Sequence, residues 1–162
     1  DFTLEPPAGF TIDNSGMVGP GIAEWNGWSF ADRDFWAQAG GQDRAAFTLA
    51  SGTVAVADSD EFDDVENDTA FASLLQTPAI ILSDVAENSV TLEFDSSFRP
   101  EGDQRGFVDV TFDGGETWTN ILTLDTQDER NNNYSFDIAN PASGEMELRF
   151  SYTGDNNWWW AI

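Results

Sequence analysis

The stretch Ser89-Val90-Thr91-Leu92-Glu93-Phe94-Asp95 alternates polar and apolar residues without a break. Successive side chains of a β-strand point to opposite faces, so Val90, Leu92 and Phe94 share one face and the polar residues share the other. The same alternation runs through residues 107–113 and 145–152. Strands with one apolar and one polar face predict antiparallel sheets.

Shorter extended stretches surround these three. They are residues 10–12, 53–57, 79–82, 117–124, 134–138 and 158–162, and turns rich in Gly, Asn, Asp and Pro separate them. About nine strands of this kind predict an all-β fold, a two-sheet antiparallel β-sandwich of jelly-roll type with little or no helix. At residues 67–75 we expect a short helical turn, with Asp68 as N-cap and Phe71, Leu74 and Leu75 facing inward.

The length and the ends of the chain bear on domain organisation. A chain of 162 residues is the size of one domain with its own core. It opens at Asp1 without a signal-like segment, and no stretch approaches the length of a membrane span. We therefore expect residues 1–162 to be a single domain excised from a larger secreted or extracellular protein, with neighbouring domains of that protein or the cell surface around it.

The charge of the chain is strongly one-sided. Thirty acidic residues face six basic ones, all arginines, which gives a net charge of −24. Such a surface repels nucleic acid and anionic membranes and suits a salty medium, as in a marine or halophilic bacterium. We expect a monomer that binds neutral glycans. The lack of cysteine and histidine removes disulfides, thiolate metal sites, most zinc chemistry and the usual general base.

An acidic stretch follows the apolar residues 53–57. Its carboxylates are Asp58, Asp60, Glu61, Asp63 and Asp64. Carboxylates this close repel one another, and Ca²⁺ is a hard cation that takes six to eight oxygen ligands in flexible geometry. We expect a calcium site here, although the spacing is not that of an EF-hand. The alternative is a solvated acidic loop.

Residues 111–118 fit the Asp-box pattern T-x-D-x-G-x-T-W. Asp113 can accept backbone hydrogen bonds within its own turn, and Gly114 and Gly115 permit positive φ. Trp118 can pack across the hairpin. Sialidases carry several copies of this motif together with an arginine triad, whereas this chain carries one copy. We therefore interpret the motif as a structural turn.

The second signal for function is an aromatic set: Trp25, Trp28, Phe35, Trp36, Trp158, Trp159 and Trp160. An exposed indole can stack on the apolar face of a sugar ring. For Trp28, Trp158 and Trp160 this interpretation and a core role stay equally open. For Trp25, Trp36 and Trp159 packing beneath a loop is favoured.

Residues 98–105 join two predicted strands and carry two of the six arginines. Arg99 and Arg105, beside Phe98, can hold a ligand carboxylate or hydroxyl pair, or can neutralise nearby acidic groups. We include all three residues in the candidate ligand-binding set and keep the structural alternative.

Several short motifs occur together in this chain. They are Glu24-Trp25-x-Gly27-Trp28, the acidic block 56–64, Thr77-Pro78-Ala79-Ile80, residues 94–99, Phe112-Asp113-Gly114-Gly115 and Asn157-Trp158-Trp159-Trp160-Ala161-Ile162. This combination resembles the MAM-like, cleaved-adhesin type of jelly-roll module in secreted bacterial proteins. The resemblance implies a non-catalytic sandwich with structural calcium and carbohydrate or surface binding.

One departure from that family concerns the metal. Its Trp-Ala-Ile end normally continues into an aspartate that helps hold the ion, and this sequence ends at Ile162. Glu24 is the first candidate to complete the site. The others are Asp32, Asp34 and Asp95.

Three functions follow as hypotheses. The preferred one is a calcium-stabilised carbohydrate-binding or cell-surface-binding module, not an enzyme, appended to a secreted hydrolase or adhesin. The second is a structural or spacer domain that packs on a neighbouring catalytic domain. The third is a jelly-roll glycoside hydrolase that pairs carboxylates such as Glu93, Glu145 and Glu147.

Overall fold

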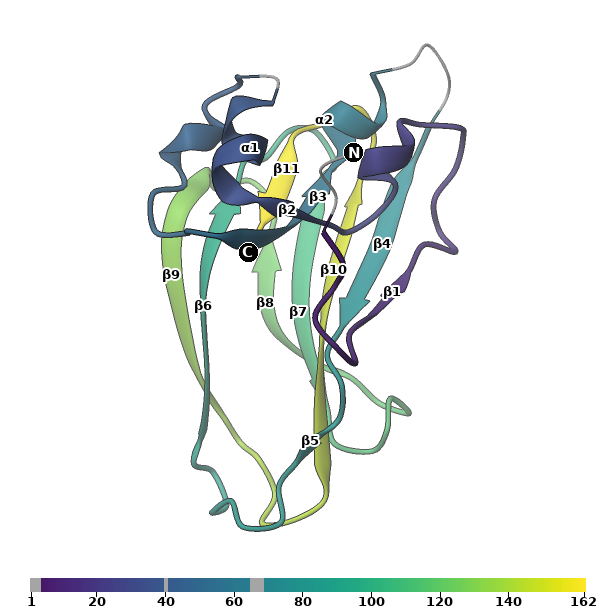
Figure 1. Ribbon diagram of the computed structural model, residues 1–162. Coiled ribbons are helices and arrows are strands. Elements are labelled where there is room, and N and C mark those ends of the chain that lie inside the picture. The colour runs from purple at the N-terminus through teal and green to yellow at the C-terminus, as the bar shows by residue number, and fades with distance from the viewer. Residues whose placement is uncertain (1–3, 40, 65–68) are drawn as a thin grey trace.

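Two antiparallel sheets face each other in the computed structural model, which describes residues 4–39, 41–64 and 69–162 (Figure 1). We call them the β10 sheet and the β6 sheet. The β10 sheet has the order β1 (Thr11–Asp13), β4 (Phe71–Gln76), β10 (Glu145–Gly154), β7 (Arg105–Thr111) and β8 (Thr119–Leu124), with β5 (Ile80–Ile81) also paired to β10. The β6 sheet has the order β2 (Ser29–Asp32), β3 (Thr53–Asp58), β11 (Trp159–Ala161), β6 (Val90–Phe98) and β9 (Glu129–Ile138).

The described residues also form four short helices: η1 (Ala23–Trp25), α1 (Arg33–Gln38), η2 (Arg44–Ala46) and α2 (Ser59–Phe62). No helix among the described residues is long and apolar enough to span a membrane. The architecture confirms the predicted antiparallel β-sandwich with little helix. Alternation along β6 and β10 turns Phe94 and Phe150 toward each other between the sheets, with ring centroids 5.5 Å apart.

The predicted helical turn at residues 67–75 is wrong where the structure describes it. Residues 71–76 form β4, in which Phe71, Ser73 and Leu75 are buried and the residues between them are half-buried. The period of burial is therefore two, and pairing with β1 and β10 on either side fixes the strand. The proposed N-cap Asp68 lies outside the described residues.

A further layer, which contains α1, covers the outer face of the β6 sheet at one end (Figure 1). The Asp32 carboxylate caps α1 by accepting hydrogen bonds from the backbone N–H groups of Asp34 and Phe35. From α1, Trp36 packs edge-on against Trp159, with 5.8 Å between ring centroids. The outer face of β11 is therefore buried, as is its inner face.

The inner face of β11 carries Trp160. Its ring meets Trp28 at 5.2 Å and Phe150 at 5.9 Å between the two sheets. The indole N–H groups of Trp159 and Trp160 donate to the hydroxyls of Ser97 and Ser96 on neighbouring β6. Successive tryptophans are thus fully buried on opposite faces of one strand.

The Asp-box hairpin forms as its sequence predicts. Asp113 Oδ1 accepts from the Thr117 N–H at 2.9 Å and from the Thr111 hydroxyl at 2.7 Å, and Gly114 and Gly115 have positive φ. Trp118 closes the turn by donating to the Gly115 carbonyl. Hydrogen bonds from Thr117, through its hydroxyl and its N–H, and from Thr111 lower the pKa of Asp113 to about 2.

Candidate functional site

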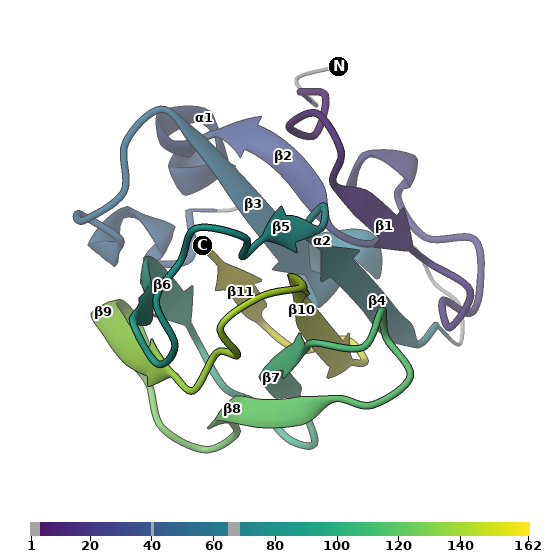
Figure 2. The same ribbon diagram turned by 90° about the horizontal axis from the view of Figure 1, so that it is seen from below.

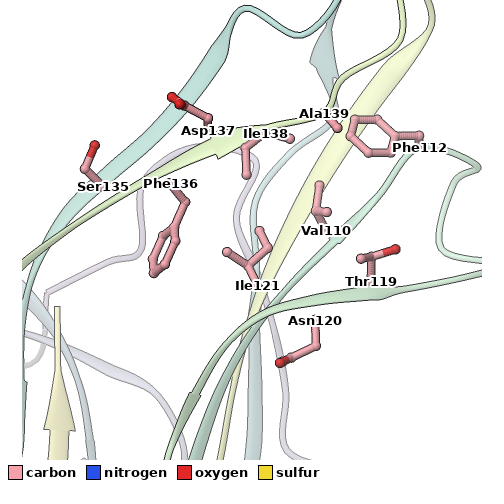
Figure 3. Close-up of a pocket in the computed structure, with 10 residues that line it drawn as sticks. All are labelled: Val110, Phe112, Thr119, Asn120, Ile121, Ser135, Phe136, Asp137, Ile138 and Ala139. Carbon is pink, nitrogen blue, oxygen red and sulfur yellow. The ribbon is translucent and has the colours of Figure 1, made fainter.

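A cleft opens between β8 and β9, which are edge strands of different sheets and lie beside each other in the end-on view (Figure 2). Its volume is about 550 Å³. The lining residues come from both sheets: Val110, Phe112, Thr119, Asn120, Ile121, Ser135, Phe136, Asp137, Ile138 and Ala139 (Figure 3). An edge strand has backbone N–H and C=O groups without a strand partner, so both rims of the cleft can bond a ligand.

The interior of the cleft is apolar. Alternation along β9 points Phe136 and Ile138 toward the opposite sheet, and Val110 and Ile121 face them from β7 and β8 (Figure 3). The register between β7 and β8 pairs Val108 with Leu122 and then Asp109 with Asn120, so Ile121 is the extra residue of a bulge. A bulge bends its strand and redirects a side chain.

Polar side chains surround the cleft without filling it. The Ser135 hydroxyl donates to Glu93 Oε1 at 3.2 Å, and the Thr91 hydroxyl donates to Asp137 Oδ1 at 3.2 Å. These residues are exposed on the outer face of the β6 sheet. A ligand held in the cleft would meet rings inside and oxygen-bearing side chains at the β9 rim.

No arginine lines the cleft, and the structure shows why. Each of the six is engaged with a carboxylate or a backbone carbonyl. The pairs are Arg33–Phe47 O, Arg44–Asp58, Arg99–Gln42 O, Arg105–Gln104 O, Arg130–Asp128 and Arg149–Asp109, at 2.6 to 3.0 Å. The cleft therefore offers an anionic ligand no cation among its lining residues.

Three of the predicted ligand-binding residues lie in the interior. Trp28 is 2% exposed, and Trp160 and Phe98 are fully buried. Their rings pack in the hydrophobic core and cannot stack on a sugar at the surface. For Trp28 and Trp160 the structure therefore favours packing over sugar stacking, and Phe98 leaves the candidate ligand-binding set, because all three side chains belong to the hydrophobic core.

Trp158, Arg99 and Arg105 stay near the surface. The Arg99 guanidinium carbon lies 3.5 Å from the centroid of the Trp158 ring, so one face of this half-buried indole is already covered. Arg105 donates to the Gln104 carbonyl at 2.6 Å. The structure brings Trp158 and Arg99 together but does not place either in the cleft between β8 and β9.

Asp58 turns inward from the acidic stretch. Its Oδ2 pairs with the Arg44 guanidinium at 3.0 Å and accepts from the Trp36 indole N–H at 3.0 Å, and its Oδ1 accepts from the Glu61 N–H. Asp58 and Arg44 are both fully buried. Burial raises the pKa of Asp58 to about 6, although Arg44 opposes the rise. Asp58 therefore leaves the predicted set of metal ligands.

The rest of the acidic stretch spreads over α2 and the turn after it. Asp60 and Glu61 share the Arg44 guanidinium at 3.5 and 2.8 Å, and Asp63 accepts from the Thr69 hydroxyl at 2.6 Å. Asp64 is exposed, and Glu24 lies on η1, which packs against α2 through the Ile22 N–H to Phe62 carbonyl bond. Within residues 4–39, 41–64 and 69–162 no three acidic side chains are arranged to hold a metal ion. The calcium site stays a prediction.

The carboxylates considered for glycoside hydrolysis do not form one site. Glu93 points outward from β6, while Glu145 and Glu147 point outward from β10. The two strands belong to opposite sheets, so Glu93 is separated from the other two by the full thickness of the sandwich. Glu147 also accepts a hydrogen bond from Gln76.

Comparison with solved structures finds chains of similar fold. The fold resembles that of a carbohydrate-binding module. That structure is described as TmCBM61 in complex with β-1,4-galactotriose, and the TM-score is 0.58 with 10% sequence identity. The match covers 96% of this chain and 84% of the other. At this identity the likeness shows the fold, a jelly-roll sandwich.

Comparison of the sequence itself adds nothing further. No protein-family model matches the chain, and the search of curated proteins finds no match.

The cleft residues were not recognised from the sequence as a site. Phe112, Ile121 and Phe136 lie in predicted strands, where they look like ordinary inward-facing residues. One signal was available: residues 134–138 alternate Tyr, Ser, Phe, Asp and Ile, with aromatic rings on a strand that turns out to be an edge.

Proposed function

We propose that this chain is a non-catalytic carbohydrate-binding module whose ligand occupies the cleft between β8 and β9. The observation that carries the proposal is the pair of aromatic rings, Phe112 and Phe136, in an apolar cleft whose rim carries hydroxyl and carboxyl groups. Sugar rings have apolar C–H faces and polar edges, and such sites combine aromatic walls with a few polar groups.

The fold supports this proposal independently of the cleft. The structurally similar module is described in complex with β-1,4-galactotriose. We therefore take a neutral hexose polymer as the ligand class, with β-1,4-galactan as the first member to test.

The charge of the chain narrows the class of glycans that we expect to bind. A net charge of −24 repels uronic and sulfated polysaccharides, and no arginine lines the cleft to bind their anions. We expect galactan to bind and polygalacturonan, whose units carry carboxylates, to fail.

Isothermal titration calorimetry with β-1,4-galacto-oligosaccharides and a panel of neutral glycans tests the proposal. We expect Phe136→Ala and Phe112→Ala to weaken binding about tenfold or more, the equivalent of about 1.4 kcal/mol. Phe107→Ala is the matched control, because Phe107 is a half-buried phenylalanine of β7 that does not line the cleft.

Two results would overturn the proposal. One is the absence of binding to every neutral glycan. The other is equal affinity of wild type and both cleft variants, with melting curves that show all proteins folded at the assay temperature. If Trp158→Ala abolished binding instead, the site would lie at the Trp158 end of the molecule.

A further inference from the structure

Thr119, the first residue of β8, brings a hydroxyl group to the lining of the cleft. The register pairs it with Val110 of β7, and residues directly opposite each other in an antiparallel pair carry their side chains on the same face of the sheet. Thr119 therefore faces the cleft as Val110 does. In Figure 3 the side chains of Thr119 and Ile121 rise on one side of β8, while Asn120 points to the other. Thr119 is exposed, so a ligand in the cleft can reach it.

The other polar side chains of the lining are engaged within the protein. Asn120 donates its amide to Asp109 Oδ1 at 2.9 Å. Ser135 and Asp137 bond to side chains of β6 on the outer face of the β6 sheet. The Thr119 hydroxyl forms no hydrogen bond with the part of the chain that the structure describes. It can therefore bond a ligand without first breaking a bond inside the protein.

The Asp-box hairpin fixes the backbone that carries this hydroxyl. Thr117, two residues before Thr119, bonds to Asp113 through its N–H and its hydroxyl, and Trp118 donates to the Gly115 carbonyl at 3.1 Å. The threonine side chain is itself branched at Cβ, which restricts its rotamers. A group held in this way loses little conformational entropy when a ligand binds.

An unbonded hydroxyl on an exposed threonine is ordinary by itself. Thr153 of β10 carries another, on the outer face of the β10 sheet. The position of Thr119 is what distinguishes it, because the side chains in the interior of the cleft are apolar. An apolar wall stacks on the C–H face of a sugar but does not distinguish one arrangement of hydroxyls from another, whereas a polar group placed to bond one hydroxyl does.

We infer that Thr119 is a specificity-determining residue of the cleft and that its hydroxyl bonds one hydroxyl group of the bound sugar. This inference rests on the function proposed above. A threonine hydroxyl both donates and accepts, so it can bond a sugar hydroxyl in either sense. Water reaches Thr119 in the free protein, and the new bond replaces one to water. The expected contribution is therefore that of one ordinary hydrogen bond, about fivefold in affinity.

Three variants test the inference by calorimetry. The probe is β-1,4-galactotriose or, if another neutral oligosaccharide binds wild type more tightly, that one. Thr119→Val keeps the shape of the side chain and removes the hydroxyl, so the affinity should fall about fivefold. Thr119→Ser keeps the hydroxyl and should stay within about twofold of wild type. Thr153→Val is the matched control and should also stay within about twofold. No variant removes a side-chain hydrogen bond among the described residues, so all melting temperatures should be close to that of wild type.

Monodeoxy analogues of the probe identify the sugar hydroxyl. One analogue should bind wild type about fivefold more weakly than the parent sugar and bind Thr119→Val as well as the parent sugar does. Equal affinity of Thr119→Val and wild type for the parent sugar, with Phe136→Ala still weakened, would overturn the inference and leave the proposed function standing. Failure of wild type to bind any neutral glycan would overturn the proposed function and the inference with it.

Discussion

Arg44 and Asp58 form an ion pair of 3.0 Å in which neither side chain is exposed to solvent. The guanidinium lies against the Trp159 ring at 5.0 Å and also pairs with Glu61 at 2.8 Å. Through its second nitrogen it donates to the Ala39 carbonyl at 2.6 Å. One arginine therefore ties the α1 and η2 layer to β3 and α2.

Replacement of Arg44 by methionine is expected to lower the free energy of unfolding by about 3–5 kcal/mol, because it leaves Asp58 buried without its counter-charge. Chemical denaturation measures the loss. Arg130→Met is the control: its pairs with Asp43 and Asp128 are largely exposed, so a change within about 1 kcal/mol is expected. A similar small loss in both variants would contradict the importance of the buried pair.

The pH dependence of stability should report on Asp58. Its pKa is about 6 in the folded protein against an ordinary value of 3.8, so the folded state binds this proton more tightly. The stabilising contribution is fully present below the unfolded pKa and is lost as the pH rises through 6. Melting curves of Asp58→Asn between pH 4 and 7 should therefore show a flatter pH dependence than those of wild type. An unchanged slope would argue against the raised pKa.

Asp113 should act in a different window and with the opposite sign. Its pKa is lowered to about 2, so it stabilises the fold above its unfolded pKa, and this stabilisation is lost as the pH falls from about 4 toward 2. Asp113→Asn should lose stability at neutral pH and lose less of it on acidification. Hairpin NMR signals of Thr117 and Trp118 would follow the effect, and loss of stability only near pH 6 would contradict it.

The predicted calcium site can be tested directly. If calcium binds the outward-facing carboxylates of the acidic stretch, the melting temperature should be higher in calcium than in EDTA at equal ionic strength. The double variant Asp63→Asn with Asp64→Asn should remove the difference. Equal melting temperatures of wild type in calcium, magnesium and EDTA would end the prediction.

The fold was predictable because burial leaves a local record in the sequence. The alternation in residues 89–95, 107–113 and 145–152 reappears as β6, β7 and β10. The Asp-box was predictable for the same reason, since all its partners lie within residues 111–118. Both depend on interactions between residues that are close in the chain or on one strand.

The site was not predictable, because it depends on which strands become edges. Phe136 faces a cleft only since β9 has no neighbour on one side and β8 lies opposite. The burial of the tryptophans was not predictable either. Both faces of β11 are buried because α1 and η2 cover the outer face of the β6 sheet there, and no local sequence pattern indicates this cover. Arg44 likewise meets Asp58 from η2, 14 residues earlier in the chain, and no local pattern pairs the two.

The placement of the tryptophans has a spectroscopic consequence. Five of the seven indoles are buried, Trp118 is half-buried beneath Arg149, and Trp158 is half-buried beneath Arg99. None of them lines the cleft between β8 and β9. Intrinsic tryptophan emission should therefore be a sensitive signal of unfolding and an insensitive one of ligand, so titrations that rely on quenching would overlook a sugar bound against Phe112 and Phe136.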